Sequence, residues 1–343
     1  MPLHDRAPTR GRARTRRRRL ALAAAGLVTS APVLAGCGLG TAGGYVPGGT
    51  LAGPLADVEP LDGATISIGS KNFSENILLG KMALILMKAD GATVTDLTNI
   101  PGSASARQAH LEGQIDAMWE YTGTGWITYL GHDKPIADEQ KQYEAVRKED
   151  AAQNSLDWLA PAPMNNTYGF AITRASAKKY GITKLSEMGK VPVKDRTFCV
   201  ESEFANRPDG LEGMLSTYGV PRGKPTGVPA GNIGLYQTGA VYDATSRGKC
   251  TFGEVFTTDG RILALHLQVL EDDRKYFPNY NVSLVVRDSV LRAHPQIKQL
   301  IEPVTKKLTN DVLLKLNAEI DVEGREPADV AAEWLRKEGF LSA

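Results

Sequence analysis

The chain has 343 residues, of which 42% are hydrophobic and 23% are charged, so it is long enough to bury a large core and to divide into two lobes. Its formal net charge of +1 averages two unlike parts. Residues 1–36 hold eight arginines and a single acid, which leaves the rest of the chain with 32 basic and 38 acidic residues. A mildly acidic body argues against a nucleic-acid partner.

The first 36 residues have the pattern of an export signal. A basic cluster that ends at 16–19 precedes an apolar stretch over 20–33, and Leu34-Ala35-Gly36-Cys37 follows. The apolar stretch is too short to cross a bilayer as a helix, which takes about 20 residues. The last four residues resemble the bacterial lipobox, in which the cysteine, here Cys37, is acylated and becomes the mature N-terminus. A plain signal peptide with an incidental cysteine is the alternative, and general secretory and twin-arginine export both stay open.

Residues 37–61 are rich in Gly, Pro and Ala, which predicts a lipidated flexible tether. We therefore expect a protein anchored by Cys37 to the outer face of the bacterial cell membrane. In that oxidising compartment the two remaining cysteines, Cys199 and Cys250, form an even pair, and each lies beside an apolar, strand-like run. A disulfide between them is the prediction, and two buried free thiols are the alternative.

The body of the chain alternates short β-like runs with helical patterns. In chain order we expect a strand at 65–69, a helix at 75–88, a strand at 93–97, a helix at 104–112, a strand at 115–119, a helix at 140–154, strands at 168–173 and 196–200, helices near 209–218 and 237–247, strands at 250–256 and 282–286, and helices near 296–308, 309–319 and 327–338. This alternation predicts an α/β fold with mainly parallel sheets.

The simplest architecture for this order has two lobes. The outer lobe is expected to contain 62–166 and 281–343, and the inner lobe 167–280. The β-like runs at 168–173 and 282–286 are expected to be the two strands that cross between the lobes.

Several short motifs occur in order along the body. They are the segments 69–75 (GSKNFSE), 120–124 (EYTGT), 165–168 (NNTY), 203–210 (EFANRPDG), 258–262 (TDGRI), 270–273 (LEDD) and 277–280 (FPNY). Together they resemble the substrate-binding proteins of glycine betaine, choline and carnitine ABC importers, the ProX/OpuC-like group, over roughly 64–340. The resemblance implies a two-lobed type II periplasmic-binding-protein fold that closes on its ligand. It also implies an ABC permease and ATPase as partners, and we expect a monomer.

A trimethylammonium group carries charge but has no N–H, so the faces of aromatic rings recognise it, each at about 0.5–2 kcal/mol. The resemblance assigns this aromatic box to Tyr121, Tyr168, Phe256 and Tyr280. The family commonly has Tyr where Phe256 stands, and Phe keeps the π-face but lacks the hydroxyl.

The carboxylate of a betaine needs donors instead. By the same resemblance, Lys71, Thr124 and Arg207 match the family's carboxylate-binding positions. Asn166 falls where some relatives have an acid facing the methyl groups, so a neutral amide there is expected to alter the balance between choline and betaine. Without the motifs around them, the tyrosines would be assigned to core packing and Lys71 to the surface. The segment 207–210 would be assigned to a turn. Tyr236, near a predicted inner-lobe helix, is assigned to packing.

Enzyme signatures do not appear. The histidines of the body are well separated in sequence, and the metalloprotease, Cys-x-x-Cys, nucleophile-elbow and P-loop patterns are missing, so we expect no catalysis and no metal or other cofactor. Two alternatives remain: the same fold binding an amino acid or another small anion, and an extracytoplasmic lipoprotein enzyme of unrecognised type.

Overall fold

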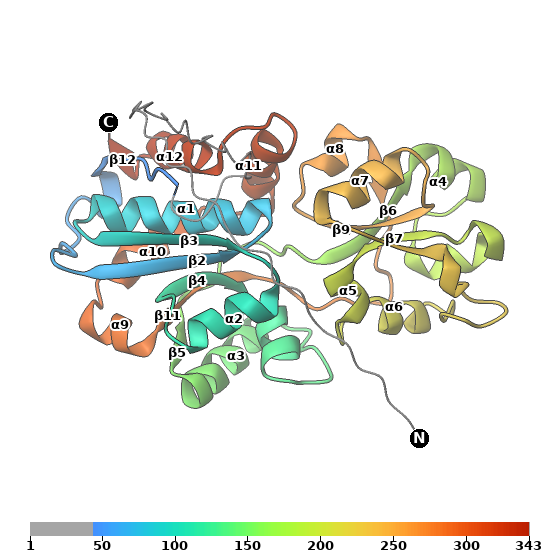
Figure 1. Cartoon of the computed structure of the whole chain (residues 1–343), viewed down its shortest axis with the longest axis horizontal. Coiled ribbons are helices and arrows are strands. Elements are labelled where there is room, and N and C mark those ends of the chain that lie inside the picture. The colour runs from blue at the N-terminus through green and yellow to red at the C-terminus, as the bar shows by residue number, and fades with distance from the viewer. Residues whose placement is uncertain (1–43, 343) are drawn as a thin grey trace, which may run out of the picture. The chain divides into compact units, whose positions relative to one another are not determined.

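The computed structural model describes residues 44–342 (Figure 1). The predicted export signal, the lipidated Cys37 and the start of the tether lie outside this range. Within it, no helix combines the length and the apolar character needed to cross a membrane.

Two five-stranded sheets organise the chain. The outer sheet has the order β3-β2-β4-β11-β5. Its strands are β2 (Thr65–Lys71), β3 (Thr93–Ile100), β4 (Ala117–Tyr121), β5 (Leu156–Trp158) and β11 (Val282–Arg287). The helices of this part are α1 (Ser74–Ala89), α2 (Ser103–Leu111), α3 (Glu139–Asn154), α9 (Asp288–Ala293), α10 (Ile297–Thr305), α11 (Asn310–Asp321) and α12 (Pro327–Lys337).

The inner sheet has the order β10-β6-β9-β7-β8. Its strands are β6 (Tyr168–Thr173), β7 (Phe198–Glu201), β8 (Ile233–Tyr236), β9 (Phe252–Phe256) and β10 (Leu267–Val269). Its helices are α4 (Arg174–Tyr180), α5 (Ser202–Asn206), α6 (Leu211–Thr217), α7 (Thr238–Ser246) and α8 (Arg261–Ala264). All five strands fall within 167–280, the range expected for the inner lobe.

Both sheets are mixed but mainly parallel, as predicted, because four of the five strands in each sheet run in one direction and one strand runs against them. In the outer sheet β2 is parallel to β3 and β4, but β11 is antiparallel to β4 and β5. In the inner sheet β7 is parallel to β8 and β9, but β6 is antiparallel to β9 and β10. The antiparallel strands β6 and β11 each follow a segment that arrives from the other sheet, and strand–helix alternation carries no signal for their direction.

The crossing itself is different from the prediction. The chain passes between the sheets through 159–167 and 270–281, which have almost no regular secondary structure. The expected crossing strands do form as β6 and β11, but each pairs within one sheet only. The ligand-site candidates Asn166 and Tyr280 therefore lie in the crossing segments.

Helix α1 fixes the base of the outer sheet. It packs on β2 and β3 and is covered by α12, α10 and α11 (Figure 1). Twelve of its 16 residues are buried, because its sequence is apolar on nearly every face. Gly80 permits close packing, since a Cβ there would lie 2.9 Å from the Thr98 methyl carbon of β3. This close packing holds the first turn of α1, which begins three residues after the end of β2, against the sheet.

The predicted tether is wrong for residues 44–61. Strand β1 (Thr50–Leu51) pairs antiparallel with β12 (Leu341–Ser342). Leu55 and Leu61 are 0% and 1% exposed within the outer hydrophobic core. The Gly, Pro and Ala content concealed these few apolar anchors, and they are sufficient to hold the segment on the folded body.

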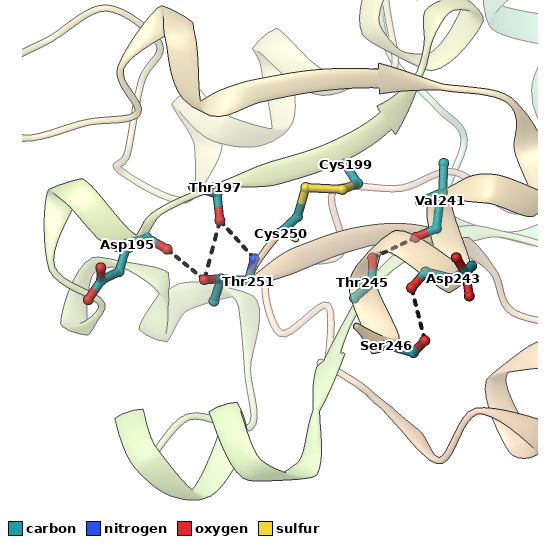
Figure 2. Close-up of a disulfide and its surroundings, with 9 residues drawn as sticks. All are labelled: Asp195, Thr197, Cys199, Val241, Asp243, Thr245, Ser246, Cys250 and Thr251. Atoms are coloured by element: carbon teal, nitrogen blue, oxygen red, sulfur yellow. Dashed lines mark hydrogen bonds between the residues drawn. A yellow bond between two sulfur atoms is a disulfide. The ribbon is translucent and has the colours of Figure 1, made fainter. Parts of the chain in front are cut away.

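A disulfide joins Cys199 of β7 to Cys250, two residues before β9 (Figure 2). The Cα atoms are 5.7 Å apart, and the bond closes a sequence separation of 51 residues. Beside it, the Thr251 N–H donates to Thr197 Oγ1 at 2.9 Å, and the Thr251 hydroxyl donates to the Asp195 carbonyl at 2.6 Å. The bond thus secures two neighbouring segments of the inner sheet.

His110 of α2 makes the stability of the fold depend on pH. Its side chain is 1% exposed, and burial, reinforced by the charge of Arg107, lowers its pKa from 6.5 to about 4. Between about pH 6.5 and pH 4, His110 is protonated in the unfolded chain but stays neutral in the native state. We therefore expect the native state to lose about 3 kcal/mol over this interval.

Urea unfolding at pH 7 and pH 4.5 checks this expectation. The variant His110→Leu should lose most of the acid destabilisation, and His266→Gln, a change at an exposed histidine, should keep it. An equal acid response in both variants would assign the effect to groups other than His110.

Candidate functional site

A cavity of about 190 Å³ is lined by residues from both sheets and both crossing segments. All eight side chains predicted to bind ligand line it: Lys71, Tyr121, Thr124, Asn166, Tyr168, Arg207, Phe256 and Tyr280. The other lining residues are Asn72, Phe73, Gly102, Ser103, Glu201, Ser202, Glu203, Tyr236, Gln237 and Thr238.

The strands explain why these residues meet. Lys71, Tyr121, Phe256 and Tyr236 are the last residues of β2, β4, β9 and β8, so they lie at the carboxyl ends of strands that run parallel within each sheet. Tyr168 begins β6, which is antiparallel to β9, and it pairs directly with Phe256. Ligands of open α/β sheets bind at this edge.

Five aromatic rings form a continuous chain along the cavity. The ring centroids are 5.9 Å apart for Tyr121 and Phe73, 5.5 Å for Phe73 and Phe256, and 5.4 Å for Phe256 and Tyr168. Tyr280 then meets Tyr168 edge-on at 5.4 Å and 87°. The first three pairs are tilted by 37°, 32° and 47°, so several π-faces can serve one small ligand.

Sequence reasoning missed Phe73 as a member of this set. The signal was present, because Phe73 lies two residues after Lys71 in a motif already associated with the family. Tyr236, assigned to packing from the sequence, also lines the cavity. It was missed because the four-residue strand β8 that ends with it was not predicted.

A close backbone approach positions the ring of Tyr280. A Cβ on Gly123 would lie 2.7 Å from the Asn279 carbonyl oxygen and 2.8 Å from the Tyr280 ring, so only glycine fits. The Tyr280 hydroxyl donates to Asp209, and burial raises the pKa of this tyrosine well above its usual value. Tyr280 is therefore a neutral ring with its hydroxyl already engaged.

The ammonium of Lys71 already lies on the aromatic wall. Its Nζ is 4.7 Å from the centroid of Tyr121 and donates to Glu120 Oε2 at 2.8 Å. The Tyr129 hydroxyl donates to the other oxygen of Glu120, also at 2.8 Å. Lys71 is 4% exposed, so its charge is matched within the protein, and its remaining N–H groups are those that could meet a ligand carboxylate.

Arg207 has a similar arrangement. Its Nε and Nη2 each donate to Asp209 at 2.8 Å in a bidentate pair, and Cζ lies 5.4 Å from the Tyr168 centroid. Burial opposes the charge, but Tyr168, Tyr280 and Asp209 together raise the pKa of Arg207. Only Nη1, 3.4 Å from Glu203, points away from the Asp209 pair. Arg207 is thus a fixed cation rather than a mobile one.

Glu203 adds an acid that the sequence did not indicate. Its Oε2 accepts the backbone N–H of Ser103, the first residue of α2, at 3.1 Å. Burial raises the pKa of Glu203, but the hydrogen bonds from Ser103 and the charges of Lys71 and Arg207 lower it overall. This contact joins helix α5 of the inner sheet to helix α2 of the outer sheet beside the cavity that both residues line.

A ligand cavity between two mixed α/β lobes, joined by two crossing segments, defines a two-lobed solute-binding protein of the type II periplasmic class. Within residues 44–342, no group of histidines, cysteines and acids is placed to hold a metal ion. Residues 64–337 match the family model of the substrate binding domain of ABC-type glycine betaine transport systems, OpuAC, and the chain belongs to this family.

Similar proteins agree with this assignment. The chain is 36% identical over 301 residues to a glycine-betaine-binding protein of Pseudomonas aeruginosa, covering 85% of this chain and 92% of that protein. It is 33% identical to the glycine betaine-binding protein YehZ of Escherichia coli, covering 82% and 93%. A crystal structure of a glycine betaine/carnitine/choline ABC transporter protein superposes with a TM-score of 0.65 at 31% identity, covering 80% and 98%. The predicted family and two-lobed fold are confirmed, and the chain is a binding protein rather than an enzyme.

Proposed function

We propose that this protein captures a quaternary-ammonium osmolyte, of the glycine betaine, choline or carnitine type, and delivers it to the permease and ATPase of an ABC importer. The observation that carries the proposal is the chain of five rings along one cavity. A methylated nitrogen offers no hydrogen-bond donor, so a wall of π-faces suits it better than it suits an amino acid or a small anion.

The roles follow from the chemistry of each group. Phe73, Tyr121, Tyr168, Phe256 and Tyr280 would surround the cation. Several rings at about 0.5–2 kcal/mol each would supply most of the roughly −8 kcal/mol of a micromolar site.

The ligand carboxylate would lie at the cationic end of the cavity. Lys71 and Arg207 would provide charged donors there, and the Thr124 hydroxyl would add a neutral one. Asn166 would face the methyl groups with an uncharged amide. The pairing of Lys71 with Glu120 and of Arg207 with Asp209 limits each cation to its remaining N–H groups.

The proposed cellular site is the outer face of the bacterial membrane, with Cys37 acylated. Because Val46 is already buried in the folded body, only residues 38–45 separate it from Cys37, a span of at most about 30 Å. The packed segment that follows would keep the binding protein close to its permease. We also propose that the protein acts as a monomer.

Titration calorimetry on the exported form, with Cys37→Ser to keep it soluble, tests the ligand class. We expect micromolar affinity for at least one of glycine betaine, choline and carnitine. Millimolar ligand should then raise the free energy of unfolding by about 4 kcal/mol, measurable as a thermal shift. If none of the three binds at millimolar concentration while an amino acid or inorganic anion does, the alternative ligand class is correct.

A further inference from the structure

Glu75 is a buried carboxylate directly behind the ring chain. It lies in the first turn of α1 and is 3% exposed. Its Oε1 accepts from the Tyr121 hydroxyl at 2.7 Å and from Asn166 Nδ2 at 2.9 Å. Its Oε2 accepts from the Thr258 hydroxyl at 2.6 Å and from Asn317 Nδ2 at 3.1 Å. Four segments that are distant in sequence therefore converge on one side chain.

All four partners present donors, and the two amides are oriented by other contacts. Asn317 Nδ2 also donates to the Thr258 carbonyl at 2.9 Å, and Asn166 Oδ1 accepts the Thr258 N–H at 3.4 Å. Two hydroxyls and two amide N–H groups form the set of partners that an ionised carboxylate accepts. Burial raises the pKa of Glu75 above its ordinary value, and these four hydrogen bonds offset part of that rise.

No cation neutralises Glu75. Among the ion pairs of residues 44–342, none includes it. Two further buried acids in contact with lining residues, Glu120 and Asp209, are paired with Lys71 and Arg207. A third, Glu254, is in none of these ion pairs, but its contact is with the backbone N–H of Glu201 rather than with a ring of the chain. The N-terminus of α1 offsets only part of a full negative charge.

Glu75 lies one layer away from the ligand cavity. Phe73, Asn166 and Phe256 line both that cavity and the small recess that contains Glu75. A methylated cation cannot donate a hydrogen bond to Glu75, so its attraction to this carboxylate does not depend on direct contact. The side chains that separate the two therefore do not prevent the interaction. Charge–charge attraction needs no direct contact and is screened less inside a protein than in water, so it can act through this layer.

We propose that Glu75 is the buried counter-charge for the cation of the ligand, and that it makes the site select a charged ammonium over a neutral group of the same shape. The proposal rests on the proposed function, and it identifies the residue that makes the ligand site prefer a positively charged ligand. Glu75 acts through space and through Tyr121, whose hydroxyl donates to the carboxylate and so makes the ring face more negative.

A pair of ligands of matched shape tests this. Glycine betaine and 3,3-dimethylbutanoate share a carboxylate and a three-methyl head, and only the first carries a positive charge. Calorimetry should show that Glu75→Gln reduces the preference for betaine on the order of tenfold, with little change in affinity for the neutral-headed ligand. If both ligands weaken equally, or the preference is unchanged, Glu75 has only a structural role. If the unmodified protein binds none of glycine betaine, choline and carnitine, the proposed function fails instead.

A second pair of variants keeps the inference testable if Glu75→Gln does not fold. Tyr121→Phe separates a ring from the unpaired Glu75, and Tyr280→Phe separates a ring from Asp209, whose charge Arg207 already matches. The betaine preference should fall clearly more in Tyr121→Phe. Equal falls in the two variants would overturn the proposal.

Discussion

Replacing Tyr168 and Phe256 together with leucine is expected to weaken the binding of betaine and choline about a hundredfold. The two rings are neighbours, 5.4 Å apart at paired positions of β6 and β9. Leucine keeps apolar volume but removes the π-face, and two desolvated rings at roughly 1.5 kcal/mol each give about 3 kcal/mol. Titration calorimetry measures the loss directly.

Two controls separate binding from folding. Tyr168→Phe keeps the ring and should retain most of the affinity. Phe198→Leu makes the same kind of change at a fully buried ring that does not line the cavity, so it should lower stability without changing affinity. If the double leucine variant binds as tightly as the parent protein, the ring chain is core packing and the ligand site lies elsewhere.

The sequence was informative where motifs end strands. Lys71 and Tyr121 were assigned from short motifs and Phe256 from the family resemblance, and each is the last residue of a strand at the edge where the two sheets face the cavity. The carboxyl ends of strands are where ligands bind in this fold. Hydrophobic patterning located the strand that ends at Phe256, but it ended the strands that contain Lys71 and Tyr121 two residues too early. All eight assigned side chains consequently line one cavity.

Charge pairing could not be predicted in the same way. Lys71 and its partner Glu120 are 49 residues apart, and Glu75 and Asn317 are 242 apart. Nothing local in the sequence says which acid meets a cation and which stays unpaired. Short strands were missed for a related reason. Strand β8 has only four residues, and its central positions are partly exposed, so its register comes from pairing with β7 rather than from its own pattern.

Removing the disulfide is expected to lower the free energy of unfolding by about 4 kcal/mol. Closing a loop of 51 residues in the unfolded chain gives this magnitude, and for a chain of this size it corresponds to a fall in Tm of about 10 °C. The change to test is Cys199→Ala with Cys250→Ala, measured by urea and thermal unfolding. The parent protein in a strong reductant should approach the double variant, and the double variant itself should not respond to reductant.

The effect on binding should be much smaller than the effect on stability. Strand β7 reaches the cavity at Glu201, two residues beyond Cys199, and β9 reaches it at Phe256. The parallel pairing of Cys199 with Gly253 and the flanking Thr251–Thr197 bond hold these strands without the sulfur atoms. Betaine affinity at 25 °C should therefore stay within a fewfold of the parent value. A large loss of affinity in a variant that is still folded would mean that the disulfide sets the geometry of the ligand site and does not act only on the unfolded chain.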